Sequence, residues 1–149
     1  MYWPLGVLLL IVSMSAGLNV QAQTGLKAQV VPKENQQVLK AVIHINFKDP
    51  DRQEHALNNL ENILKEASDA ELVVVCHGEG ITLLSKKQTK QSEVIQTLTK
   101  KGVRFEACEN TMRKKSLSKE DLLEGIKTVP SGAVEIIRKQ SEGYSYFKP

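Results

Sequence analysis

The residue best suited to chemistry in this chain is Cys108, which follows alternating apolar and polar positions at residues 103–107. That alternation is typical of a β-strand, and Gly102 provides a turn into it. The cysteine is followed by Glu-Asn-Thr, residue types that favour the start of a helix. Unpaired N–H groups in a first helical turn, together with the helix dipole, stabilise an anion. The sequence therefore predicts a thiol that ionises readily and acts as a nucleophile.

Two other interpretations of the cysteines remain open at this point. Cys108 could instead be a small, inert residue buried at a strand end. Cys76 also ends a predicted strand, so a disulfide or a redox-active dithiol between the two cysteines is conceivable, provided their α-carbons lie within about 7 Å. Their spacing is not the Cys-x-x-Cys of thiol oxidoreductases. We therefore expect Cys76 to fill the core.

A His-Gly-Glu-Gly motif at residues 77–80 is the best candidate for binding a ligand beside the thiol. His77 can donate a hydrogen bond to a bound anion or carry a proton near Cys108. Gly78 and Gly80 allow backbone N–H groups to turn inward as an anion nest, although a plain turn explains them equally well. A Gly-x-Gly pair alone is weak evidence for an anion site.

Three further residues complete the candidate binding set: Asn110 and Thr111, which start the helix after the cysteine, and Asn58. Asn58 is unusual inside a predicted helix. We expect its side chain to reach either the site or a neighbouring subunit, and a solvated position is the alternative. His44 lies inside a predicted strand and is expected to be a satisfied core histidine, whereas His55 is expected in solvent. These separated histidines show no metal-ligand spacing, and no nucleotide-binding motif is present, so no metal or cofactor is expected.

These residues would be positioned by strands that alternate with helices. Apolar runs at residues 40–47 and 72–76 are typical of strands buried on both faces. Asp49 and Pro50 are a favourable cap and first position for the helix between them. Further helices are predicted over residues 92–100 and 133–142, and a third begins at a capping box formed by Ser118 and Asp121. Short strands are predicted at 127–129 and 144–147. This alternation predicts a parallel sheet covered on both faces, whose ligand site lies beyond the C-terminal strand ends.

Length and charge limit the possible classes of function. The chain has 149 residues, of which 41% are hydrophobic and 25% charged, enough for one domain with a real core. The net charge of +3 is scattered along the chain, which argues against nucleic acid as a partner. The basic run at residues 113–115 is expected to be a solvated helix surface.

The first segment is predicted to lie outside the fold. Residues 1–22 contain no charged side chain, include an apolar run at 5–12, and end in Val-Gln-Ala, which is typical of a secretory signal peptide. We expect residues 23–38 to be a flexible lead-in and residues 39–149 to form the domain. Export to the periplasm or another oxidising compartment follows. The missing Lys or Arg near the N-terminus leaves a retained membrane anchor as the alternative.

Four motifs together make residues 40–149 resemble the DsrE/DsrF-like family, whose members include subunits of sulfur-relay complexes. They are Ala-Leu-Asn-Asn at 56–59, His-Gly-Glu-Gly at 77–80, Val-Arg-Phe-Glu-Ala-Cys-Glu-Asn-Thr at 103–111, and Val-Pro-Ser-Gly at 129–132 with the closing Tyr-Phe-Lys-Pro. The resemblance implies a three-layer α/β/α sandwich with a five-stranded parallel sheet, commonly assembled into trimers or hexamers. It also implies that Cys108 matches the family's sulfur-carrying cysteine.

Three functional hypotheses follow. The first is an exported sulfur-handling protein that carries sulfane sulfur as a persulfide on Cys108 and exchanges it with a thiol-containing protein or small molecule, without a cofactor. The second is a non-catalytic module that binds a small anion in the same pocket or supports assembly. The third is a dithiol redox protein that uses Cys76 and Cys108.

Overall fold

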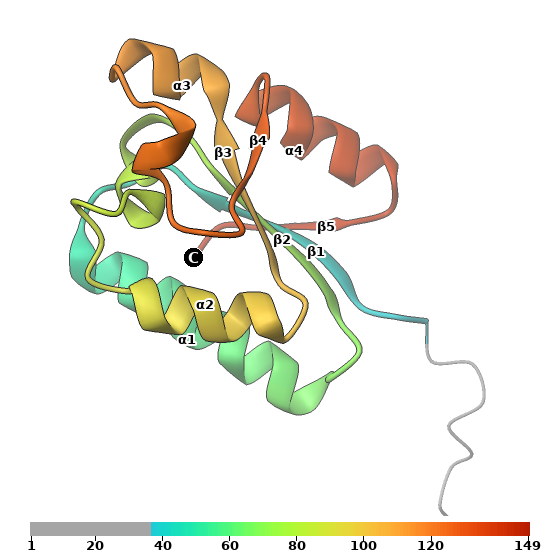
Figure 1. The fold of residues 1–149 in the computed structure, drawn as a ribbon. Coiled ribbons are helices and arrows are strands. Elements are labelled where there is room, and N and C mark those ends of the chain that lie inside the picture. The colour runs from blue at the N-terminus through green and yellow to red at the C-terminus, as the bar shows by residue number, and fades with distance from the viewer. Residues whose placement is uncertain (1–36) are drawn as a thin grey trace, which may run out of the picture. The chain divides into compact units, whose positions relative to one another are not determined.

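The computed structural model describes residues 37–149 (Figure 1). The predicted signal peptide and nearly all of the predicted lead-in lie outside the described residues. Within the described part, no helix is both long enough and apolar enough to cross a membrane. The strands are β1 (Lys40–Ile45), β2 (Glu71–Cys76), β3 (Arg104–Cys108), β4 (Lys127–Val129) and β5 (Ser145–Phe147). The helices are α1 (Pro50–Glu66), α2 (Ser92–Lys100), α3 (Glu109–Lys114) and α4 (Gly132–Ser141), with 3₁₀ helices η1 (Gly78–Leu84) and η2 (Lys119–Asp121).

The strands form one sheet in the order β4-β3-β2-β1-β5, and every neighbouring pair is parallel. The predicted five-stranded parallel sheet is therefore confirmed. The last strand, β5, lies at an edge beside β1, as its short alternating sequence predicted. Because all strands run in the same direction, the segments that follow β1, β2 and β3 leave the sheet at one edge.

Helices cover the two faces of the sheet unequally. Helices α1 and α2 lie on one face and α4 lies on the other, which gives the predicted three-layer α/β/α sandwich (Figure 1). The larger core packs the first two helices on the sheet, and its fully buried members include Ile43, Leu57, Leu60, Val74, Ile95, Leu98 and Phe105. The face under α4 has a smaller apolar cluster of Val42, Val73, Val75, Ile136 and Tyr144. Much of that second face is therefore left for polar side chains.

Capping residues predicted from the sequence start two helices, but only the first of these helices continues. Helix α1 begins as predicted, because Pro50 is its first residue and the Asp49 carboxylate accepts the Arg52 N–H at 2.8 Å. The predicted capping box between Ser118 and Asp121 also forms, but the helix it opens is only the three-residue η2. The chain then extends, because the buried Leu123 donates its N–H to the Leu84 carbonyl at 2.9 Å. Packing against η1 thus ends a helix that its cap would allow to continue.

Candidate functional site

The site lies where β2 and β3 end and α4 begins. Cys108 is the last residue of β3 and the N-cap of α3, and its side chain is 4% exposed. His77 directly follows β2. A Cβ atom placed on Gly132, the first residue of α4, would lie 3.0 Å from the His77 Cβ and 3.3 Å from the Cys108 Cβ. His77 and Cys108 are therefore neighbours across Gly132, and the close approach of α4 favours a residue without a side chain.

Hydrogen-bond donors surround the sulfur of Cys108. Burial by itself raises the pKa of this thiol, but the N–H groups of Gly132 and Thr111, the Thr111 hydroxyl and the Asn110 N–H all lower it. The net effect holds the pKa of Cys108 below its ordinary value. The Asn110 N–H is shared, since it also approaches the Pro130 carbonyl at 3.3 Å. This arrangement supports the predicted ionisable thiol at the start of a helix.

The two glycines of the His-Gly-Glu-Gly motif serve the turn itself. Gly78 has a φ of +54°, a backbone conformation that favours glycine, and donates its N–H to the Thr111 hydroxyl at 2.9 Å. Gly80 donates its N–H to the His77 carbonyl at 3.0 Å. A Cβ on Gly80 would lie 2.1 Å from the Ile45 carbonyl oxygen, so only glycine fits there. Both amides are used within the protein, and the plain-turn interpretation accounts for both residues.

His44 is hydrogen-bonded through both ring nitrogens, as expected of a satisfied histidine, but it is not in the core. It is half-buried on β1, and its Nε2 lies 2.6 Å from Nε2 of His77, while its Nδ1 lies 2.8 Å from the Tyr146 hydroxyl. The two imidazole rings stack with their centroids 4.6 Å apart. Burial, then His77, then Lys148 lower the pKa of His44 to about 4. Burial and Lys148 also lower the pKa of His77, so both rings are neutral at pH 7.

Sequence reasoning missed this histidine pair because it depends on strand register. His44 pairs with Val75 of β2, so His77 comes two residues later and faces the same side of the sheet. Tyr146 pairs with Val42 of β1 and also faces that side. A period-2 count from β1 would have placed His44 on the α4 face, but the sequence did not show which strands are neighbours.

The two cysteines point to opposite faces of the sheet. Cys76 pairs with Ala107, and both belong to the core under α1 and α2, whereas Cys108 is one residue further and faces α4. From strand spacing and rise, their α-carbons are about 6 Å apart, within disulfide range. Their Cβ vectors diverge, however, and both thiols are free. Opposite faces do not favour the dithiol hypothesis, although the distance criterion is met, and Cys76, whose pKa is raised by complete burial, fills the core as expected.

Glu106 flanks the thiol in the sequence, and the structure places it on the same face of the sheet as Cys108. It faces α4, two residues before Cys108, and is only 6% exposed, with its Oε2 atom lacking a hydrogen-bond partner among the described residues. Burial and the nearby Glu135 carboxylate raise the pKa of Glu106, with opposing effects from Arg104, Lys139 and Arg138. A carboxyl group shifted toward its neutral form opposes the Cys108 thiolate less than a full charge would.

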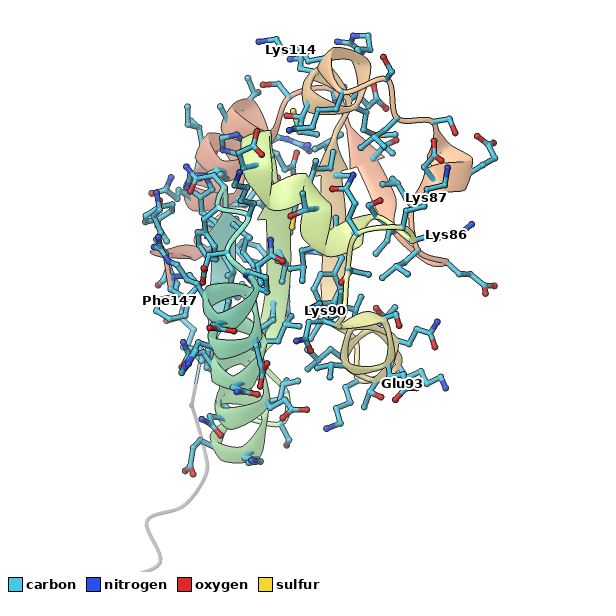
Figure 2. The ribbon with its side chains drawn as sticks, turned by 90° about the vertical axis from the view of Figure 1, so that its left-hand side faces the viewer. Lys86, Lys87, Lys90, Glu93, Lys114 and Phe147 are labelled. Atoms are coloured by element: carbon cyan, nitrogen blue, oxygen red, sulfur yellow. The ribbon has the colours of Figure 1, made fainter. Side chains whose placement is uncertain are left out.

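The remaining candidates lie at the surface. Asn58 is exposed on α1, in the helical layer opposite α4, and its side chain makes no hydrogen bond within the described residues. The basic run on α3 is solvated as expected: Lys114 is exposed at the end of the helix (Figure 2), and Lys115 pairs with Glu79 at 2.7 Å. Exposed Arg113 donates to the Asn110 side-chain oxygen. Residues 37–149 contain no group of three or more His, Cys, Asp or Glu side chains arranged to hold a metal ion.

Comparison with known proteins identifies the family. The DsrE/DsrF-like family matches residues 40–149. The structure of MTH1491, a protein of unknown function from Methanobacterium thermoautotrophicum, is similar with 34% identity and a TM-score of 0.72, over 74% of this chain and 99% of that one. The ychN protein from E. coli shares the fold, with 15% identity and a TM-score of 0.66, over 75% and 100% of the two chains. No curated protein matches the chain. Because this match extends from the start of β1 to residue 149, the chain belongs to the DsrE/DsrF-like family.

Proposed function

We propose that this protein carries sulfane sulfur as a persulfide on Cys108. The observation that carries the proposal is the set of donors around its sulfur, namely three backbone N–H groups and the Thr111 hydroxyl. Such donors stabilise the thiolate, which is the form that attacks a sulfur donor. Membership of a family that includes sulfur-relay proteins supports the same role.

The proposed reaction is a thiol–persulfide exchange. The Cys108 thiolate attacks the outer sulfur of a persulfide R–S–SH, a new S–S bond forms, and the bond from that sulfur to R–S breaks. The electron pair stays on R–S, which takes a proton and leaves as R–SH. Cys108 then holds the –S–SH group and passes the outer sulfur to an acceptor thiol in the reverse sense. Donor and acceptor are thiol-containing proteins or small molecules, and no cofactor is needed for the balance.

Intact mass spectrometry of the purified protein tests this role directly. After incubation with a cysteine persulfide, we expect the mass to rise by one sulfur atom and to return to its starting value with a reductant. The Cys108→Ser variant should show no gain, whereas Cys76→Ala, the matched control in the core, should gain the sulfur normally. Loading that survives Cys108→Ser, or a wild-type protein that takes up no sulfur, would rule out the proposal.

A second function is favoured by the low exposure of the same thiol. Because Cys108 is only 4% exposed, a non-catalytic module that binds a small anion at the start of α3 is the alternative. It predicts slow alkylation of Cys108 by iodoacetamide and unchanged anion binding in Cys108→Ala. Rapid alkylation of Cys108 in the folded protein would argue for the sulfur carrier instead.

Assembly and location complete the proposal. We expect a homo-oligomer, because α4 alone covers its face of the sheet and exposes Val134 and Ile137 to solvent. The uncharged residues 1–22 favour export, which would place the sulfur donor and acceptor outside the cytoplasm. A membrane contact is expected only if that first segment is retained.

A further inference from the structure

A chain of hydrogen bonds runs from solvent to the neighbourhood of Cys108. Tyr146, exposed on the edge strand β5, contacts Nδ1 of His44 through its hydroxyl at 2.8 Å. Nε2 of His44 then contacts Nε2 of His77 at 2.6 Å. His77 and Cys108 both adjoin Gly132. The Cδ2 edge of the His77 ring faces Gly132, and Nδ1, on the other edge of the ring, makes no hydrogen bond within the described residues.

The protonation of this chain is constrained by its geometry. A neutral imidazole has one N–H donor and one acceptor nitrogen, so each contact needs a donor on one side and an acceptor on the other. When the Tyr146 hydroxyl donates to Nδ1 of His44, the His44 proton must sit on Nε2, where it is donated to Nε2 of His77. His77 then carries its own proton on Nδ1, the nitrogen that is free.

We propose that Tyr146 and His44 are positioning residues that orient His77 and resupply its proton, so that His77 protonates the thiol that leaves when Cys108 accepts sulfur. This inference rests on the proposed sulfur-carrier function and adds the group that completes its chemistry. Cys108 releases its proton to solvent when it ionises. As the S–S bond of the donor breaks, the leaving R–S takes the Nδ1 proton of His77. The Nε2 atom of His77 then accepts the proton on Nε2 of His44, and Nδ1 of His44 accepts the hydroxyl proton of Tyr146. Water returns a proton to Tyr146.

The low basicity of the histidine pair is consistent with such a relay. Both rings are held neutral by burial and by the nearby Lys148 charge, so each keeps one N–H and one acceptor nitrogen near pH 7. A chain of this kind moves protons in either direction, and it therefore serves sulfur loading and sulfur release equally. A ring that were permanently charged would have no acceptor nitrogen and would break the chain.

The dependence of the rate on the leaving group tests the proposal. An alkyl thiolate is basic and needs a proton as it leaves, whereas a nitroaryl thiolate is a weak base and leaves as the anion. We therefore compare two reactions of the same Cys108 by rapid-quench mass spectrometry: sulfur transfer from a cysteine persulfide and mixed-disulfide formation with a nitroaryl disulfide. In His44→Gln we expect the first rate to fall by about tenfold and the second to stay at the wild-type value.

Two further variants keep the test decisive. Tyr146→Phe removes a single hydroxyl from an exposed side chain and should show a smaller selective loss with the persulfide; it decides the matter alone if His44→Gln does not fold. His55→Gln, on the exposed side of α1, is the matched control and should match wild type in both reactions.

Each other outcome overturns the relay. Equal rates in wild type and both relay variants would mean that the chain transfers no proton in the reaction. Equal loss with both reagents would indicate a structural effect on Cys108. If the wild-type protein shows no Cys108-dependent loading at all, the sulfur-carrier function itself fails, and that result is distinct from a relay that makes no difference.

Discussion

At Cys108, burial and hydrogen bonding act in opposite directions on the thiolate. Removing a thiol from water raises its pKa, yet the donors at the start of α3 and α4 outweigh this effect. Thr111 has a double role, because its hydroxyl accepts the Gly78 N–H and donates to the sulfur. One hydroxyl therefore links the loop after β2 to the reactive atom on β3.

Removing that hydroxyl should raise the pKa of Cys108. A hydrogen bond to a charged group contributes about 1.5 to 3 kcal/mol, so Thr111→Val should shift the pKa of Cys108 upward and reduce the thiolate fraction near pH 7. The pH dependence of the Cys108 alkylation rate measures this shift. Thr111→Ser, which keeps the hydroxyl, should restore the wild-type profile, and Thr97→Val on the exposed side of α2 should leave it unchanged. An unaltered profile in Thr111→Val would show that the hydroxyl does not support the thiolate.

At the scale of elements, β3 supports the fold with one face and the site with the other. Phe105 and Ala107 pack into the core under α1 and α2. Glu106 and Cys108 face α4, whose first residue closes over the thiol. The period of two along one strand thus separates the hydrophobic contribution to stability from the chemistry. It also explains why a shift of one residue in register would destroy both.

The loop after β2 should be intolerant of any side chain at Gly80. A Cβ there would overlap the Ile45 backbone of β1, so Gly80→Ala should lower the free energy of unfolding by about 3 kcal/mol or more. Gly143→Ala is the control: it also changes a glycine, at φ +87° but in open space, and should cost about 1 kcal/mol. Urea denaturation measures both values. Equal losses would show that close backbone approach is not what requires glycine at position 80.

The buried Glu106 should make stability depend on pH at the interface of β3 and α4. Its pKa in the folded protein is raised above the ordinary 4.5, so its favourable contribution is complete below that value and is lost as the pH rises through the folded pKa. Glu106→Gln remains neutral. We therefore expect the variant to gain about 1 kcal/mol over wild type at pH 8 and nothing at pH 4.

Urea denaturation at these two pH values checks the Glu106 prediction. Glu124→Gln, at an exposed position outside the helices and strands, provides the matched control and should differ little from wild type at either pH. A difference between Glu106→Gln and wild type that is the same at both pH values would contradict the assigned direction.

Much of this architecture could be predicted from local sequence, and its limits have physical causes. Largely apolar runs identified β1 and β2, and Asp49 with Pro50 marked the start of α1, because these signals act over a few residues. The pairing of His44 with His77 could not be predicted, since it depends on which strands are neighbours and in what register. The same register decided that the two cysteines face apart.

For the whole molecule, the two faces of the sheet differ in how well they are covered. One face carries α1 and α2, and the other carries α4 alone (Figure 1). Helix α4 leaves Val134 61% exposed and Ile137 66% exposed, one turn apart on its outer side. The lysines between η1 and α2 project outward instead (Figure 2), and Lys86, Lys87 and Lys90 are all exposed. The outer side of α4 is therefore the apolar surface best placed to meet a second copy of the chain.

Charging that surface should weaken assembly without unfolding the chain. We expect the wild-type protein to sediment as a homo-oligomer, and Val134→Lys combined with Ile137→Lys to shift it toward the monomer, because each substitution would bury a charge in an apolar contact. Gln96→Lys on α2, an exposed position in the opposite helical layer, should leave the sedimentation coefficient unchanged. Circular dichroism verifies that every variant is folded. A wild-type monomer, or an oligomer that survives both α4 substitutions, would show that this surface does not hold the copies together.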